Sequence, residues 1–133
     1  DFIIHLCLHL YKEATTSEWV FRRKDLNLYK FNDIYILLTK KGSTEMYKKL
    51  AERITHYGVE KECYFALFHT RVIYTKLEEM EGYNEMLDII RPSNLDYIRQ
   101  IVNPLEKVVY EYNMNFLDWL ACEDRKQALL NDD

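Results

Sequence analysis

The stretch that most strongly determines the predicted fold is residues 103–130, which read NPLEKVVYEYNMNFLDWLACEDRKQALL. It opens like a helix, because Asn103 is a good N-cap, Pro104 suits the first helical position and Glu106 completes a capping box. The apolar residues that follow recur at helical spacing and form one stripe, made of Leu105, Val108, Val109, Tyr112, Phe116, Trp119 and Leu120. The pattern therefore predicts a long C-terminal helix over about residues 104–129.

The composition of the whole chain also favours helices. Only three glycines and two prolines occur in 133 residues, whereas all-β folds need many turns rich in these residues. Hydrophobic residues make up 48% of the chain, which is enough for a core and argues against disorder. A chain of this length without a linker or an internal repeat is expected to form one domain. We therefore predict an all-α fold, a single compact bundle of six to eight helices spanning residues 1–133.

Residues 60–80 form the most apolar of the predicted helices. The apolar side chains wrap nearly all the way round it, and they are Cys63, Tyr64, Phe65, Ala66, Leu67, Phe68, Val72, Ile73, Tyr74 and Leu77. A helix that is apolar on most faces is normally surrounded by other helices. This segment is therefore predicted to be the central helix of the bundle.

The first thirteen residues permit two interpretations. As a strand they alternate along their length, and as a helix they place His5, His9 and Lys12 on one narrow polar face. A strand of this length would be unusual, so a helix is preferred. His5 and His9 then lie four residues apart, a spacing that lets two imidazoles share a metal ion if further ligands come from elsewhere. Paired histidines on a helix surface are the commoner outcome, and no metal or cofactor is predicted.

A basic segment spans residues 22–53 and holds nine of the 18 Lys and Arg residues. Residues 31–57 look like a helix–turn–helix with Gly42 in the turn, although Leu38 stands where a small residue is needed. The candidate nucleic-acid contacts are Arg22, Arg23, Lys24, Lys48, Lys49 and Arg53. A solvated helix surface explains these residues equally well. A nucleic-acid-binding regulator is therefore the alternative function.

No motif in the sequence names a reaction. The phosphate-binding, dinucleotide-binding, serine-hydrolase and zinc-protease patterns GxxxxGK[ST], GxGxxG, GxSxG and HExxH do not occur, so the interpretation leans against an enzyme. Cys7, Cys63 and Cys122 lie far apart and are expected to be reduced thiols. No apolar run is long enough to span a membrane and no signal peptide is visible, so a cytoplasmic location is expected.

The predicted C-terminal helix carries more apolar residues than one stripe can hold. The candidate partner-binding residues on it are Tyr110, Met114, Leu117 and Trp119. Aromatic residues and Met are enriched at interface centres, and symmetric dimers are the commonest oligomers. We therefore predict a small cytoplasmic protein–protein interaction domain, accessory or regulatory, that forms a homodimer. Tyr, Lys, Ile and Asn are abundant, as is typical of AT-rich genomes, and this favours a low-GC bacterium, a phage, a large DNA virus or a protist as the source.

Overall fold

The computed structural model describes residues 1–130, which fold mainly into helices with one small sheet. In chain order the elements are α1 (Phe2–Thr15), α2 (Ser17–Phe21), α3 (Leu28–Lys40), α4 (Thr44–Tyr57), α5 (Glu60–Ile73), the 3-10 turn η1 (Thr75–Glu79), α6 (Tyr83–Ile90), the 3-10 turn η2 (Asp96–Arg99), β1 (Gln100–Asn103), β2 (Val108–Glu111), α7 (Phe116–Ala121) and α8 (Arg125–Leu130). The prediction of a mostly helical chain is confirmed. The prediction of a purely all-α fold is wrong, because β1 and β2 form an antiparallel hairpin.

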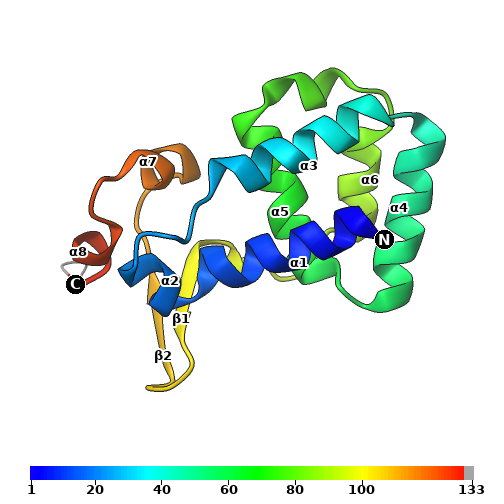
Figure 1. Ribbon diagram of the computed structural model, residues 1–133. Coiled ribbons are helices and arrows are strands. Elements are labelled where there is room, and N and C mark those ends of the chain that lie inside the picture. The colour runs from blue at the N-terminus through cyan, green and yellow to red at the C-terminus, as the bar shows by residue number, and fades with distance from the viewer. Residues whose placement is uncertain (131–133) are drawn as a thin grey trace.

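The secondary-structure elements gather at two opposite ends of the molecule, as Figure 1 shows. At one end α4 packs against α6, and α3 lies nearby. At the other end lie α2, α7, α8 and the hairpin, which extends away from the helices. Helix α1 links the two, since it packs on α3 and α5 and also contacts α2 and β1. In the described part of the chain, no helix has the length and apolar character needed to cross a membrane.

The N-terminal segment is a helix, as preferred over a strand. Its inner face buries Ile4, Cys7 and Leu10, and these side chains belong to the core shared with α3 and α5. His5 and His9 lie on the exposed side of the same helix. The apolar spacing of this segment therefore separates a buried face from a polar one, as expected for an amphipathic helix.

Helix α5 buries side chains over most of its length and contacts α1, α3, α4, α6 and α7. It is shorter than the helix predicted over residues 60–80, because it ends at Ile73 and η1 begins at Thr75. The residues at its end, Val72, Ile73 and Thr75, are β-branched, which lowers helix propensity. The predicted central helix is therefore corrected to fourteen residues followed by a 3-10 turn.

The long helix predicted over residues 104–129 is absent. In its place the chain forms the β1–β2 hairpin and two short helices, α7 and α8. Asn103 does act as a cap, but its Oδ1 accepts the backbone N–H groups of Leu105 and Glu106 within the turn, at 3.2 and 3.1 Å. Lys107 closes the turn in the left-handed region at φ +56°. The capping pattern therefore marks a hairpin turn, since Asn-Pro also starts type I turns.

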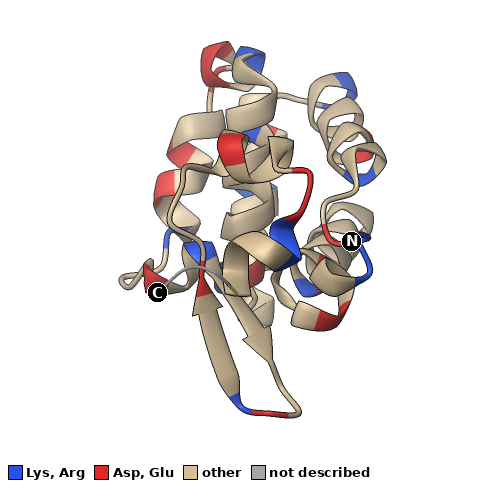
Figure 2. Ribbon diagram, turned by 90° about the vertical axis from the view of Figure 1, so that its left-hand side faces the viewer, with Lys and Arg blue, Asp and Glu red and all other residues tan. Residues whose placement is uncertain are grey.

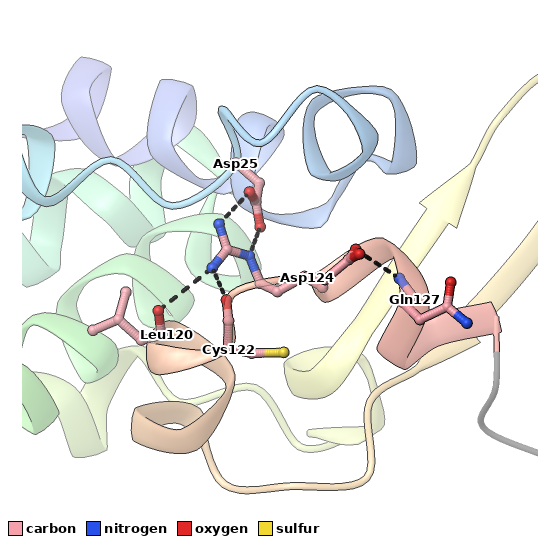
Figure 3. A network of polar contacts seen from close by, with 6 residues as sticks. Asp25, Leu120, Cys122, Asp124 and Gln127 are labelled. Atoms are coloured by element: carbon pink, nitrogen blue, oxygen red, sulfur yellow. Dashed lines mark hydrogen bonds and ion pairs between the residues drawn. The ribbon is translucent and has the colours of Figure 1, made fainter.

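A buried ion pair fastens the C-terminal segment to the loop between α2 and α3, as Figure 3 shows. Arg125 donates from Nε and Nη2 to the two carboxylate oxygens of Asp25, each at 2.8 Å. Its Nη1 also donates to the carbonyl of Cys122 at 3.1 Å. The Asp25 side chain is fully buried, so this bidentate ion pair offsets the free-energy cost of removing its carboxylate from water.

Candidate interaction surface

The hairpin carries a cluster of exposed apolar side chains. We call Val102, Leu105, Val108 and Val109 the hairpin surface. Leu105, at the tip, is 94% exposed, and Val109 is 55% exposed. Scattered exposed apolar residues are common, but these four lie within one turn and its two short strands. Figure 2 shows the strands almost free of charged residues, which gather at the turn and at the opposite end of β2.

The outer edge of β2 has unpaired backbone groups. The Tyr112 N–H donates to the Arg99 carbonyl at 3.1 Å, and Val102 and Val109 face each other three positions further along. Hydrogen-bonded and non-hydrogen-bonded pairs alternate along an antiparallel ladder. Val109 and Glu111 therefore direct their backbone N–H and C=O groups away from β1. Among residues 1–130, β2 pairs with β1 alone.

Charges of opposite sign flank this edge. Lys107 precedes β2 and Glu111 is its last residue, and both are exposed. The carboxylate of Glu111 lies 3.8 Å from the guanidinium of Arg99, and both side chains are about half exposed, so their attraction is weak. The apolar residues Val108, Val109 and Tyr110 lie between the two charges. Along the chain, this edge therefore has a positively charged side chain, then three apolar residues, then a negatively charged side chain.

The four predicted partner residues do not share the flank of one helix. Tyr110 lies in β2, Met114 in the following loop, and Leu117 and Trp119 in α7. Leu117 is half exposed, whereas Tyr110 and Met114 are half-buried. Trp119 is only 1% exposed, and its ring stacks on Tyr112 with centroids 4.3 Å apart. The Trp119 indole is therefore buried within its own chain.

The hairpin surface was missed by the sequence interpretation. Val108 and Val109 fall in the predicted C-terminal helix, although β-branched residues are enriched in strands. The Val-Val pair next to an Asn-Pro turn was the available signal. It was outweighed by the helical spacing of the residues that follow.

The six basic residues predicted for nucleic acid are not gathered on one face. Arg22, Arg23 and Lys24 follow α2, whereas Lys48, Lys49 and Arg53 lie on α4, at the other end of the molecule (Figure 1). Four of the six also lie next to acids, in the pairs Arg22–Glu18 at 3.0 Å, Arg23–Asp124 at 3.9 Å, Lys49–Glu45 at 3.1 Å and Arg53–Asp1 at 2.8 Å. The described residues therefore present no continuous basic surface from this set.

A groove of about 570 Å³ lies between the start of α1, the end of α3 and α4. Phe2, Met46 and Leu50 form much of its apolar wall. Its charged residues include the ion pairs Arg53–Asp1 and Lys49–Glu45. Each of these two ion pairs is neutral overall, so together they add no net charge to the groove.

Comparison of the chain with models of protein families, with curated proteins and with solved structures finds no match.

Proposed function

We propose that this chain is a protein–protein interaction domain that associates with a second copy of itself, through pairing of β2 with β2. The observation that carries the proposal is the unpaired, apolar edge of β2. Natural proteins usually protect such edges with Lys, Pro, a bulge or a covering element. Residues 108–110 include no Lys or Pro, and the last residue of β2, Glu111, is exposed. An edge left in this state is suited to strand addition.

The direction of the backbone groups limits the register of such a pair. In an antiparallel pair of identical strands, two outward-directed residues must face each other. A two-fold axis at Val109 meets this condition, because the two copies of Val109 then exchange their N–H and C=O groups. Lys107 of each copy then faces Glu111 of the other. Opposite charges directly across a strand pair are stabilising, which favours this register over neighbouring ones.

Pairing would also make the sheet larger and bring the two copies of Val109 together. A two-stranded hairpin is marginal on its own, whereas four strands share an apolar face made by Val102 and Val109 from both copies. Four residues per strand bury less than the ~1,200 Å² of a typical stable interface. The dimer is therefore expected to be weak and to depend on protein concentration. Weak, reversible association suits an accessory or regulatory domain.

The proposal places the protein in the cytoplasm. Cys7 and Cys63 are buried free thiols on the contacting helices α1 and α5, which is in keeping with a reducing compartment. The alternative of a nucleic-acid-binding regulator has less support, because its basic residues lie at two ends of the molecule and mostly next to acids.

Sedimentation velocity of the untagged chain over a wide concentration range tests the proposal. The wild type is expected to shift from monomer to dimer as its concentration rises. Val109→Lys places two like charges together at the two-fold axis and is expected to keep the protein monomeric. Leu105→Lys adds the same charge to the same hairpin, at the tip and off the edge, and is expected to leave the dimer intact.

Any other sedimentation result contradicts part of the proposal. A wild type that stays monomeric at the highest concentration rules out self-association. Loss of the dimer in both variants moves the contact from the edge of β2 to the apolar tip. A dimer that survives Val109→Lys places the interface elsewhere. Circular dichroism of both variants establishes that the hairpin substitutions leave the fold unchanged.

A further inference from the structure

His5 and His9 lie next to each other on the exposed side of α1. Their ring centroids are 4.5 Å apart and the ring planes are tilted by 59°. Both residues lie inside the regular helix Phe2–Thr15, one turn apart. The two imidazoles are therefore held close together by the backbone, and both are open to solvent.

This separation fits two ligands on one ion. With metal–nitrogen bonds of ~2.1 Å, two imidazoles bound side by side on one ion have ring centroids about 4.5–5.5 Å apart. Rotation about the side-chain bonds of the two histidines can direct one nitrogen of each ring toward a common point. The opposite face of α1 is fixed in the core by Ile4, Cys7 and Leu10, so the helix that presents the pair is rigid.

The charged groups around the pair are already engaged or lie further along the helix. The Asp1 carboxylate accepts from Arg53 and from the Ile3 N–H, and Glu13 is paired with Lys30. Among the described residues, no group of three or more His, Cys, Asp and Glu side chains is arranged to hold an ion. The chain therefore offers two nitrogen ligands, and the remaining positions on an ion would face solvent.

We propose that His5 and His9 form a two-histidine chelate for a divalent transition-metal ion of the Zn²⁺, Ni²⁺ and Cu²⁺ class. Imidazole nitrogen suits these ions, whereas Ca²⁺ and Mg²⁺ prefer oxygen ligands. Water fills the other coordination positions, or a side chain of another molecule does. This site is independent of the hairpin, since it lies on α1 and does not involve β2.

Isothermal titration of the untagged full chain with Ni²⁺ tests the site, with Zn²⁺ as a second probe. Ni²⁺ is preferred to Cu²⁺ because Cu²⁺ oxidises thiols such as the half-buried Cys122. One ion per chain is expected for the wild type. His5→Ala and His9→Ala are each expected to weaken binding by at least about tenfold, because a single imidazole loses the gain from a second, linked ligand. Mg²⁺ is expected not to bind.

Two controls separate chelation from the mere presence of histidine. His56→Ala removes another exposed histidine and is expected to leave Ni²⁺ affinity unchanged. The double variant His9→Ala, Lys12→His keeps the histidine count but moves the second ligand two turns from His5, so it is expected to bind no better than His9→Ala. Ni²⁺ is also expected to raise the unfolding midpoint of the wild type and not of His5→Ala, because only the folded helix brings the two ligands together.

Equal Ni²⁺ binding by the wild type and the two single variants would overturn the proposal, as would no binding by the wild type. Loss of affinity in His56→Ala would place the ion elsewhere. Retained tight binding in the double variant would mean that histidine number, and not spacing, sets the affinity.

Discussion

His69 and Phe116 stack face to face, with ring centroids 3.9 Å apart, although one belongs to α5 and the other to α7. The imidazole is 2% exposed, and its Nδ1 has no hydrogen-bond partner. Phe65 approaches its edge at 4.4 Å between centroids. Burial lowers the pKa of His69 to about 3, against a smaller opposing effect of the Phe65 backbone. The neutral imidazole therefore belongs to the core that joins the C-terminal segment to α5.

This burial predicts a loss of stability in mild acid. The ordinary pKa of 6.5 applies to His69 in the unfolded chain, which therefore binds a proton as the pH falls below 6.5 while the folded chain does not. The stabilising contribution is complete above this value and is lost progressively as the pH falls toward 3. Between pH 7 and pH 5.5 the wild type should lose about 1 kcal/mol of unfolding free energy more than His69→Phe, measured by urea denaturation. Parallel pH curves for the wild type and His69→Phe would contradict the assignment.

Removing Arg125 is expected to destabilise the protein strongly. Arg125→Ala leaves the buried Asp25 carboxylate without its partner and should lower the unfolding free energy by ~3–5 kcal/mol. Lys49→Ala breaks the exposed pair with Glu45 and should cost less than ~1 kcal/mol. The double variant Arg125→Met, Asp25→Leu should be more stable than Arg125→Ala, because it removes both charges. A loss below ~1 kcal/mol in Arg125→Ala, by urea denaturation, would show that water replaces the guanidinium.

Two glycines should respond to alanine for different reasons. A Cβ on Gly42 would lie 2.2 Å from the Leu38 carbonyl oxygen and 2.4 Å from the Tyr47 hydroxyl. The Tyr47 hydroxyl donates a buried hydrogen bond to this carbonyl at 2.8 Å. Gly42→Ala should therefore cost ~2–4 kcal/mol through overpacking and loss of this bond. Gly58 has open space around it but lies at φ +68°, so Gly58→Ala should cost only ~1 kcal/mol of backbone strain. Thermal unfolding of both variants checks the order, and a larger loss for Gly58→Ala would be evidence against the close packing at Gly42.

In the proposed register, Lys107 of each copy faces Glu111 of the other, so exchanging these charges should change the affinity of the dimer. Glu111→Lys or Lys107→Glu alone turns two attractive contacts per dimer into repulsive ones and should weaken dimerisation by about tenfold. The combined variant restores opposite charges and should recover most of the affinity. Each variant keeps the apolar edge, so sedimentation equilibrium isolates the charge pairing. Equal affinities for all four proteins would exclude the two-fold axis at Val109 while leaving the edge itself available.

Local signals explain which elements were predictable. Ser43 caps α4 through its side chain, and Gly58 ends that helix in the left-handed region, as their residue types predict. Asn103 shows the limit of the same reasoning. An Asn before Pro accepts N–H groups two and three residues later both at a helix start and in a type I turn. Only the strand pairing that follows distinguishes the two, and it depends on Val102 and Val109 meeting across the turn.

The ion pair between Asp25 and Arg125 could not be predicted from local sequence patterns. Asp25 lies in the loop between α2 and α3, and no residue near it in the sequence indicates that it is buried. Its partner lies 100 positions away. Likewise, the basic residues of segment 22–53 are close in sequence but separated in space, because α3 carries the chain from one end of the molecule to the other (Figure 1).

The separation of Asp25 and Arg125 along the chain also determines the delay between the synthesis of the two residues. A ribosome adds ~5–20 residues per second, so ~5–20 s pass between the two residues as the nascent chain grows. During this interval the Asp25 carboxylate lacks the guanidinium that neutralises it in the fold. The loop that carries Asp25 is then accessible to chaperones and proteases. Closure of the ion pair therefore marks the moment at which translation has delivered nearly all of the described fold.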